Sequence, residues 1–118
     1  MKVWAAELWN APKIRVQKDQ RLSVSASGEW KDWGRPCGPE GYESERLKPF
    51  EALRRAPKAR WLELIGCIDK RLDLSFPIGV RGQVVAPAAG EVYLFANDVW
   101  FMYWNNSGCI EVEITAVS

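Results

Sequence analysis

Three side chains that carry oxygen ligands stand close together near the C-terminal end of the chain: Asp98, Asn105 and Asn106. A carboxylate and two carboxamides supply hard oxygens, and irregular backbone between them adds carbonyl oxygens. Calcium takes about six to eight such ligands, whereas zinc prefers His or Cys and the chain contains no His. Magnesium requires a stricter octahedron. These residue types therefore favour calcium among the common divalent ions.

The same residues also have a purely structural interpretation. Residues 105–108, Asn-Asn-Ser-Gly, form a common turn sequence, and Asp98 can cap a turn through local backbone bonds. The spacing differs from that of the EF-hand loop, in which acids alternate around a glycine and the loop closes with Glu. A turn and a metal site therefore both remain open on residue types alone.

The elements that must position these residues are predicted to be β-strands. Period-two alternation of apolar and polar residues marks 21–27 and 109–117, with the apolar set facing inward. Residues 60–65 and 91–96 are apolar enough for strands buried on both faces. If strands 91–96 and 109–117 are hydrogen-bonded neighbours, the segment between them brings Asp98 close to the paired amides. Shorter candidate strands are 2–9, 13–17, 73–76 and 83–86.

This pattern predicts an all-β fold, a small antiparallel jelly-roll β-sandwich, with a single domain over residues 1–118. Turn signals separate the strands, and long helical patterns between them are lacking. The one helical prospect is 44–56. Pro49 lies inside it, so we expect a single turn or a loop there.

Composition excludes some partners. Sixteen Lys and Arg residues nearly balance fifteen Asp and Glu, and the formal net charge of +1 gives no electrostatic footprint for nucleic acid. No apolar run approaches the roughly 18 residues that cross a bilayer, so we expect no membrane insertion. Glu7 interrupts any signal-peptide core. We therefore expect cytoplasmic synthesis without a signal peptide, with release to the extracellular space left open.

Other reactive groups favour no enzyme activity. Cys37, Cys67 and Cys109 are odd in number, which favours free thiols, and no His exists to activate one of them. The acids between residues 40 and 45 lie in a loop rich in Gly and Pro. Glycoside hydrolysis needs a pair of carboxylates at a set separation, which such a loop does not predict. The basic cluster of Arg54, Arg55, Lys58 and Arg60 is interpreted as a solvated face.

Segment 97–108 contains a fairly specific run: Asn-Asp-Val, then Tyr103, then Asn-Asn-Ser-Gly, with no gap in the spacing. This run resembles the calcium and sugar loop of the bacterial galactophilic lectins of the PA-IL type. Weaker similarity covers most of the chain, at residues 28–30, 33–34, 38–41, Pro87 and Gly90, whereas 44–58 aligns poorly.

The resemblance implies a jelly-roll sandwich whose calcium is shared between the protein and galactose hydroxyls. It implies side-chain ligands from Asp98, Asn105 and Asn106, and backbone carbonyl ligands from Met102 and Trp33. Asp98, Asn105 and the Val99 N–H would also bind sugar hydroxyls, with Trp33 and Met102 in the same sugar site.

Three aromatic residues depart from that family pattern. Trp100, Phe101 and Trp104 replace a proline and small glycines, and the family's His and Gln at the sugar's primary hydroxyl have no match here. The aromatic rings can stack on a pyranose, plug the pocket or pack against another subunit.

We therefore expect a calcium-dependent, non-catalytic lectin for galactosides or related glycans, active as a homo-oligomer, a dimer or tetramer. The exposed aromatics expected at subunit contacts are Trp4, Trp9, Trp100 and Trp104. The alternative is a protein-interaction module on the same sandwich, with an occluded or repurposed sugar site.

Overall fold

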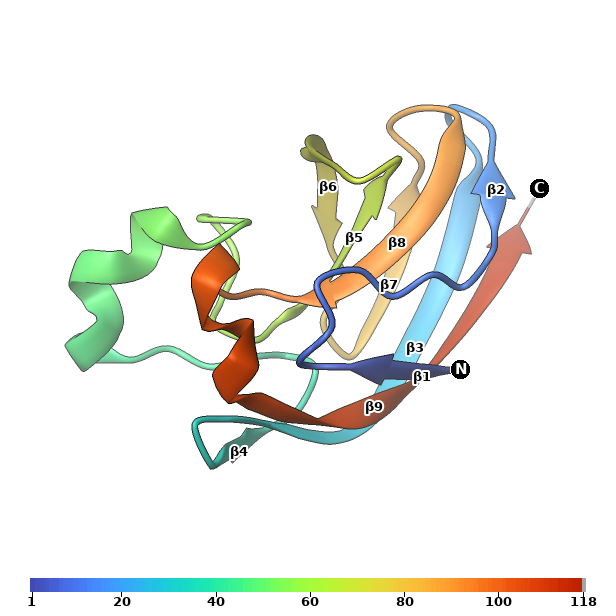
Figure 1. Cartoon of the computed structure of the whole chain (residues 1–118). Helices are drawn as coiled ribbons and strands as arrows, with labels where there is room; N and C mark the ends of the chain where they lie inside the picture. The colour runs from blue at the N-terminus through green and yellow to red at the C-terminus, as the bar shows by residue number, and fades with distance from the viewer. Residues whose placement is uncertain (118) are drawn as a thin grey trace.

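Two antiparallel β-sheets stack on each other in the computed structural model, which describes residues 1–117 (Figure 1). The first sheet contains, in spatial order, β1 (Lys2–Trp4), β9 (Asn106–Val117), β3 (Arg21–Asp32) and β4 (Arg35–Cys37), with β7 (Arg81–Val85) also paired to β3. The second sheet contains β2 (Arg15–Val16), β8 (Gly90–Ala96), β5 (Leu64–Ile68) and β6 (Arg71–Pro77). The predicted all-β, antiparallel jelly-roll sandwich is confirmed. None of the helices in residues 1–117 has the length and apolar character that a membrane span requires.

The long pairing of β3 with β9 sets the geometry of the first sheet. Its register runs without a break from Arg21 opposite Val117 to Asp32 opposite Asn106. The predicted strand 21–27 therefore continues for five more residues and ends beside the start of β9. This register places the end of β3 next to the paired amides.

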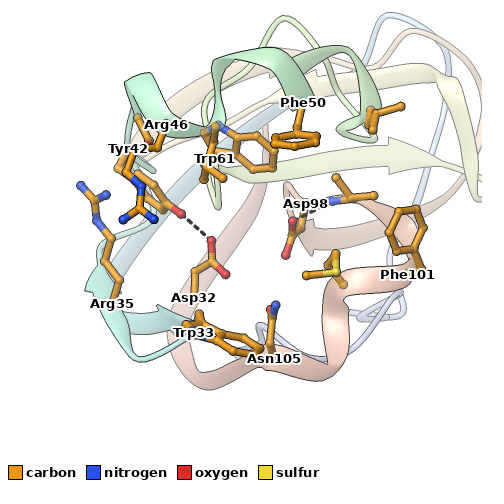
Figure 2. A pocket seen from close by; sticks show the side chains of 15 residues that line it. Asp32, Trp33, Arg35, Tyr42, Arg46, Phe50, Trp61, Asp98, Phe101 and Asn105 are labelled. Atoms are coloured by element: carbon orange, nitrogen blue, oxygen red, sulfur yellow. Dashed lines mark hydrogen bonds between the residues drawn. The ribbon is translucent and has the colours of Figure 1, made fainter.

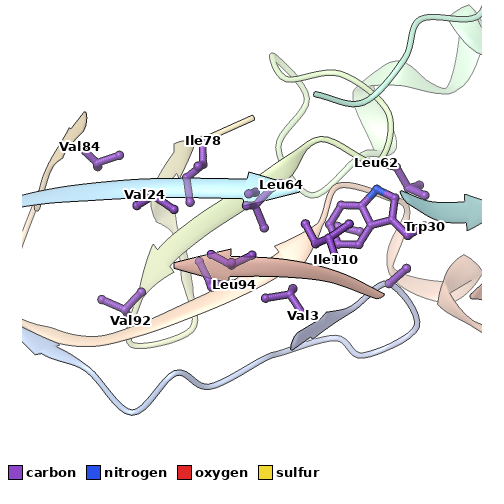
Figure 3. Close-up of a cluster of buried hydrophobic side chains, with 14 of the residues drawn as sticks. Val3, Val24, Trp30, Leu62, Leu64, Ile78, Val84, Val92, Leu94 and Ile110 are labelled. Atoms are coloured by element: carbon purple, nitrogen blue, oxygen red, sulfur yellow. The ribbon is translucent and has the colours of Figure 1, made fainter. Parts of the chain in front are cut away.

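The core lies between the sheets and confirms most of the inward-facing pattern. Trp30 and Leu62 are fully buried at one end, and Leu64, Leu94 and Ile110 continue the cluster between the sheets (Figure 3). Removal of this apolar surface from water is the main favourable contribution to folding. In β9 the alternation fails near the end of the strand, where the side chain of Ala116 is exposed. Ala116 is the second-last residue of β9, and Val112 is the last buried residue of this strand.

Two helical segments interrupt the sheets and lie at the same end of the molecule (Figure 1). The 3₁₀ helix η1 spans Glu45–Leu53, where a single turn or loop was expected. Pro49 has no N–H to donate and interrupts an α-helix, whereas 3₁₀ turns occur in short pieces. The second 3₁₀ helix, η2, spans Trp100–Asn105.

The predicted strands differ from the observed ones in their bounds and in their pairing, and the strands predicted at 2–9 and 13–17 are shorter in the structure. The strand predicted at 60–65 begins only at Leu64, because Trp61 forms an isolated bridge with Tyr42 instead. The condition that strands 91–96 and 109–117 are hydrogen-bonded neighbours is not met, since β8 pairs with β2 and β5 while β9 pairs with β1 and β3. The segment therefore crosses from one sheet to the other at the end of the sandwich.

Candidate functional site

Asn97 anchors the beginning of the crossover. Its side chain is fully buried and accepts a hydrogen bond from the N–H of Ala56 at 2.9 Å. The same amide donates to the carbonyl oxygens of Ala56 and Arg60, both at 2.9 Å. Asn97 therefore joins the end of β8 to the chain between η1 and β5, and its role is structural.

Asp98 is buried, with 3% of its surface exposed. Its Oδ1 accepts a hydrogen bond from the Val99 N–H at 2.7 Å, whereas Oδ2 is buried without a hydrogen-bond partner among residues 1–117. Burial raises the pKa of Asp98 to about 7, and the negative charge of Asp32 adds to this rise. The Val99 N–H and the Asn106 amide lower the pKa in part.

The two amides share the same feature. Asn106 is buried at the start of β9 and donates through Nδ2 to the Ala5 carbonyl at 3.2 Å, which leaves its Oδ1 without a donor in the described chain. Oδ1 of Asn105 is also buried and unpaired there. Each buried oxygen without a donor costs about 1–3 kcal/mol. The three predicted side-chain ligands thus each present one hard oxygen that needs a positive partner, so the residues fit a calcium ion.

The predicted backbone ligands lie in the same region. The N–H of Trp33 donates to the Asn105 carbonyl at 3.0 Å, and Trp33 adopts a left-handed backbone with φ of 53° at the turn after β3. The N–H of Met102 donates to the Val99 carbonyl at 3.0 Å within the first turn of η2. The first bond holds Trp33 next to the crossover segment 97–108, and the second fixes Met102 within that segment.

Five of the six predicted site residues line one pocket of about 710 Å³ (Figure 2). They are Trp33, Asp98, Val99, Met102 and Asn105. Asn106, the sixth, is next to Asn105 in the chain and buried. The pocket therefore brings together residues from the turn after β3, from the start of the crossover and from η2, and Asn106 begins β9 directly after them.

Sequence reasoning missed the opposite wall of this pocket. Asp32 ends β3, and the Tyr42 hydroxyl donates a hydrogen bond to its Oδ2 (Figure 2). The Arg35 guanidinium lies 3.9 Å from the centre of the Tyr42 ring. Burial and the hydrogen bond to Asp32 raise the pKa of Tyr42, so its hydroxyl stays protonated. The only available signal was the position of Asp32, one residue before the matched Trp33-Gly34 pair.

The aromatic residues of η2 have different positions. Phe101 lines the pocket and is 71% exposed, whereas the Trp104 ring packs edge-to-face on Trp33 with centroids 5.2 Å apart. Trp100 packs edge-to-face on Trp9 at 5.8 Å instead. The rings therefore border the pocket or turn away from it, and they do not plug it.

A buried arginine holds η2 against the sandwich. The predicted solvated face is wrong for Arg54 and Arg55, which are 6% and 4% exposed. The Arg55 guanidinium lies within 3.8–5.2 Å of the centres of four rings, and the backbone N–H of Arg55 donates to the Asp98 carbonyl at 3.1 Å. The rings are Trp9, Phe95, Trp100 and Tyr103. Cation–π contacts of a desolvated arginine explain this burial without a carboxylate partner.

The cysteines are not bonded to one another. Cys67 is a buried free thiol, and Cys37 and Cys109 are half-buried free thiols. Burial raises the pKa of Cys37 to about 11, with a further rise from the charge of Asp32. A thiol with such a pKa is a poor nucleophile near neutral pH.

The chain matches no protein-family profile and no curated protein. Among solved structures, a protein described as "EclA N-terminal domain; PllA-like lectin" has a similar fold, with a TM-score of 0.74 and 20% sequence identity. The similarity covers 99% of this chain and 94% of that one. At this identity the likeness shows the fold, a β-sandwich that is also found in a lectin.

Proposed function

We propose that this protein is a calcium-dependent, non-catalytic lectin for galactosides or related glycans. The observation that carries the proposal is the set of three buried oxygens without donors, Oδ2 of Asp98 and Oδ1 of Asn105 and Asn106. Buried polar atoms in folded proteins usually have a hydrogen-bond partner, so a cation is a simple partner for three unpaired oxygens that come from one short segment of the chain.

Each residue has a defined part in this proposal. Asp98 supplies negative charge, and Asn105 and Asn106 supply neutral oxygens. Met102 and Trp33 would add backbone carbonyls. Bound calcium supplies a positive centre for two neighbouring sugar hydroxyls. Asp98 and Asn105 would accept the protons of those hydroxyls, next to the Val99 N–H.

The surroundings of the site suit a small polar ligand. The pocket volume of about 710 Å³ falls within the range of about 300–1,000 Å³ that is usual for ligand sites. Phe101 offers an aromatic face at the border, and the apolar face of a pyranose can pack on it. The similar fold of a protein described as a PllA-like lectin supports glycan binding as the general class.

The test is calorimetry with galactose and a small panel of neutral sugars, in calcium and again after chelation. We expect sugar binding in calcium, none after chelation and none for Asp98→Ala. A wild-type protein that binds neither calcium nor any sugar of the panel contradicts the proposal. Weak binding to one site would gain from several linked copies, so a homo-oligomer is part of the proposal.

A second candidate function rests on the exposed aromatic rings. Phe101, Trp104 and Trp33 are 71%, 69% and 68% exposed, and clustered exposed aromatics also mark protein interfaces. In that case the pocket end binds protein. Oligomerisation in chelator that is lost in Trp104→Ala, together with no sugar binding, would favour this function.

A further inference from the structure

A second carboxylate faces the candidate cation site from the opposite wall. Figure 2 shows Asp32 and Asp98 on either side of the pocket, with Asn105 at its edge. The Tyr42 hydroxyl donates a hydrogen bond to Oδ2 of Asp32. Within residues 1–117, no other hydrogen bond and no Lys or Arg ion pair reaches this carboxylate. Its second oxygen is therefore free to meet a ligand in the pocket.

The position of Asp32 is fixed on both sides. Its backbone is opposite Asn106 in the β3–β9 register, and the next residue, Trp33, is bonded to Asn105. Tyr42 is 8% exposed and exchanges two backbone hydrogen bonds with Trp61, at 2.9 and 3.0 Å. The carboxylate is thus held in place by the folded chain before any ligand arrives, which is the arrangement that favours tight binding.

Two carboxylates in one pocket repel each other unless a cation lies between them. The structure gives neither of them a Lys or Arg partner in the described residues. One carboxylate neutralises half of the charge of a divalent ion, whereas two neutralise it completely. Asp32 thus supplies the charge that Asp98 alone lacks.

We propose that Asp32 is a further acidic residue of the cation site, that it holds a divalent cation together with Asp98, and that Tyr42 is its positioning residue. The inference rests on the proposed function and deepens it. A site with two carboxylates and one divalent ion has no net charge. It therefore selects neutral sugars, and removal of the Asp32 charge would improve the relative binding of acidic sugars.

The experiment is calcium titration by calorimetry on protein stripped with chelator, at one pH and low salt. We expect Asp32→Asn to weaken calcium binding about tenfold or more, and Tyr42→Phe to weaken it severalfold. Glu113→Gln removes an exposed charge from β9, opposite Ser25 in the β3–β9 pairing. This control should stay within about twofold of wild type.

Thermal melts in chelator separate this role from a structural one. Loss of the repulsion between two carboxylates should leave stripped Asp32→Asn at least as stable as wild type, whereas a structural role predicts a lower melting temperature. If Asp32→Asn does not fold, Tyr42→Phe carries the test. Unchanged calcium affinity in the folded variant overturns the inference and leaves the proposed function standing. No calcium binding by wild type, instead, removes the proposed function.

Discussion

Nη1 of Arg55 lies 2.8 Å from the hydroxyl oxygen of Tyr103, and this hydrogen bond ties η2 to the chain that follows η1. The Tyr103 hydroxyl in turn donates to the Ala96 carbonyl at the end of β8. Burial raises the pKa of Tyr103 and keeps it protonated as this donor. The helix that carries Met102 and Asn105 therefore depends on a residue outside the pocket.

We expect Arg55→Ala to destabilise the protein by about 2–4 kcal/mol, because it removes the side-chain hydrogen bonds to the Leu8 carbonyl and the Tyr103 hydroxyl, and several cation–π contacts, from a buried position. Urea unfolding followed by tryptophan fluorescence measures the change. Arg60→Ala is the control, since its side chain is 49% exposed. It should stay within about 0.5 kcal/mol of wild type. A similar small effect for Arg55→Ala would show that the arginine does not hold η2.

Some features could be predicted from sequence because they depend on local pattern. The alternation of Leu22, Val24 and Ala26 predicted β3, and all three side chains are buried as expected. Asp98 was predicted to lie close to Asn105 and Asn106, and in the structure Asp98 and Asn105 line the same pocket. Their metal-binding roles remain predictions.

Other features depend on contacts that no local pattern contains. Arg54 and Arg55 have the composition of a solvated face, yet aromatic rings cover both, and the four rings around Arg55 are far away in the sequence. Asp32 reaches the pocket because β3 continues beyond the alternating residues 21–27. The hydroxyl of Tyr42, ten residues later, donates a hydrogen bond to its carboxylate. Distant pairing, rather than residue type, decided these positions.

Gly41 tests how rigidly the bridge between Tyr42 and Trp61 is held. Its backbone has φ of +73°, and an added Cβ would lie 2.4 Å from the Trp61 carbonyl oxygen and 2.7 Å from the Glu63 nitrogen. Gly34 has a similar φ of +82°, with nothing within 4 Å of an added Cβ. Gly34→Ala should therefore cost only the backbone strain, about 1–2 kcal/mol. Gly41→Ala should cost clearly more in urea unfolding, and equal costs would mean that the Tyr42–Trp61 bridge shifts easily.

Phe101 should contribute to sugar binding without contributing to calcium binding. It lines the pocket, but its side chain has no ligand oxygen. We expect Phe101→Ala to weaken sugar affinity about threefold to tenfold, the equivalent of roughly 1 kcal/mol of apolar contact. Calcium affinity should not change. Val85→Ala is the control, because Val85 is exposed in β7 and does not line the pocket. Equal sugar affinity in both variants would exclude stacking on Phe101.

Calcium should stabilise the folded protein, because it binds the native site and not the unfolded chain. At a concentration of about 100 times its Kd, this contributes about 2.7 kcal/mol. Thermal melts in calcium and in chelator measure the difference, and Asp98→Ala should abolish it. Magnesium at the same concentration should act more weakly, because it needs a stricter octahedral geometry. An identical melting temperature in calcium and chelator contradicts a calcium site.

The pH dependence of the metal-free protein follows from the pKa of Asp98, which burial raises to about 7. A carboxyl whose pKa is higher in the folded state than in the unfolded chain keeps its proton more tightly when folded. Stability therefore falls as the pH rises from about 4 to 7, by at most about 4 kcal/mol for this group. Asp98→Asn should remove that fall in urea unfolding measured in chelator. With calcium present the direction reverses, since the ion competes with the proton and binds more tightly as the pH rises through 7. A metal-free protein whose stability is flat from pH 4 to 7, in both wild type and variant, would show that Asp98 is ionised at little cost.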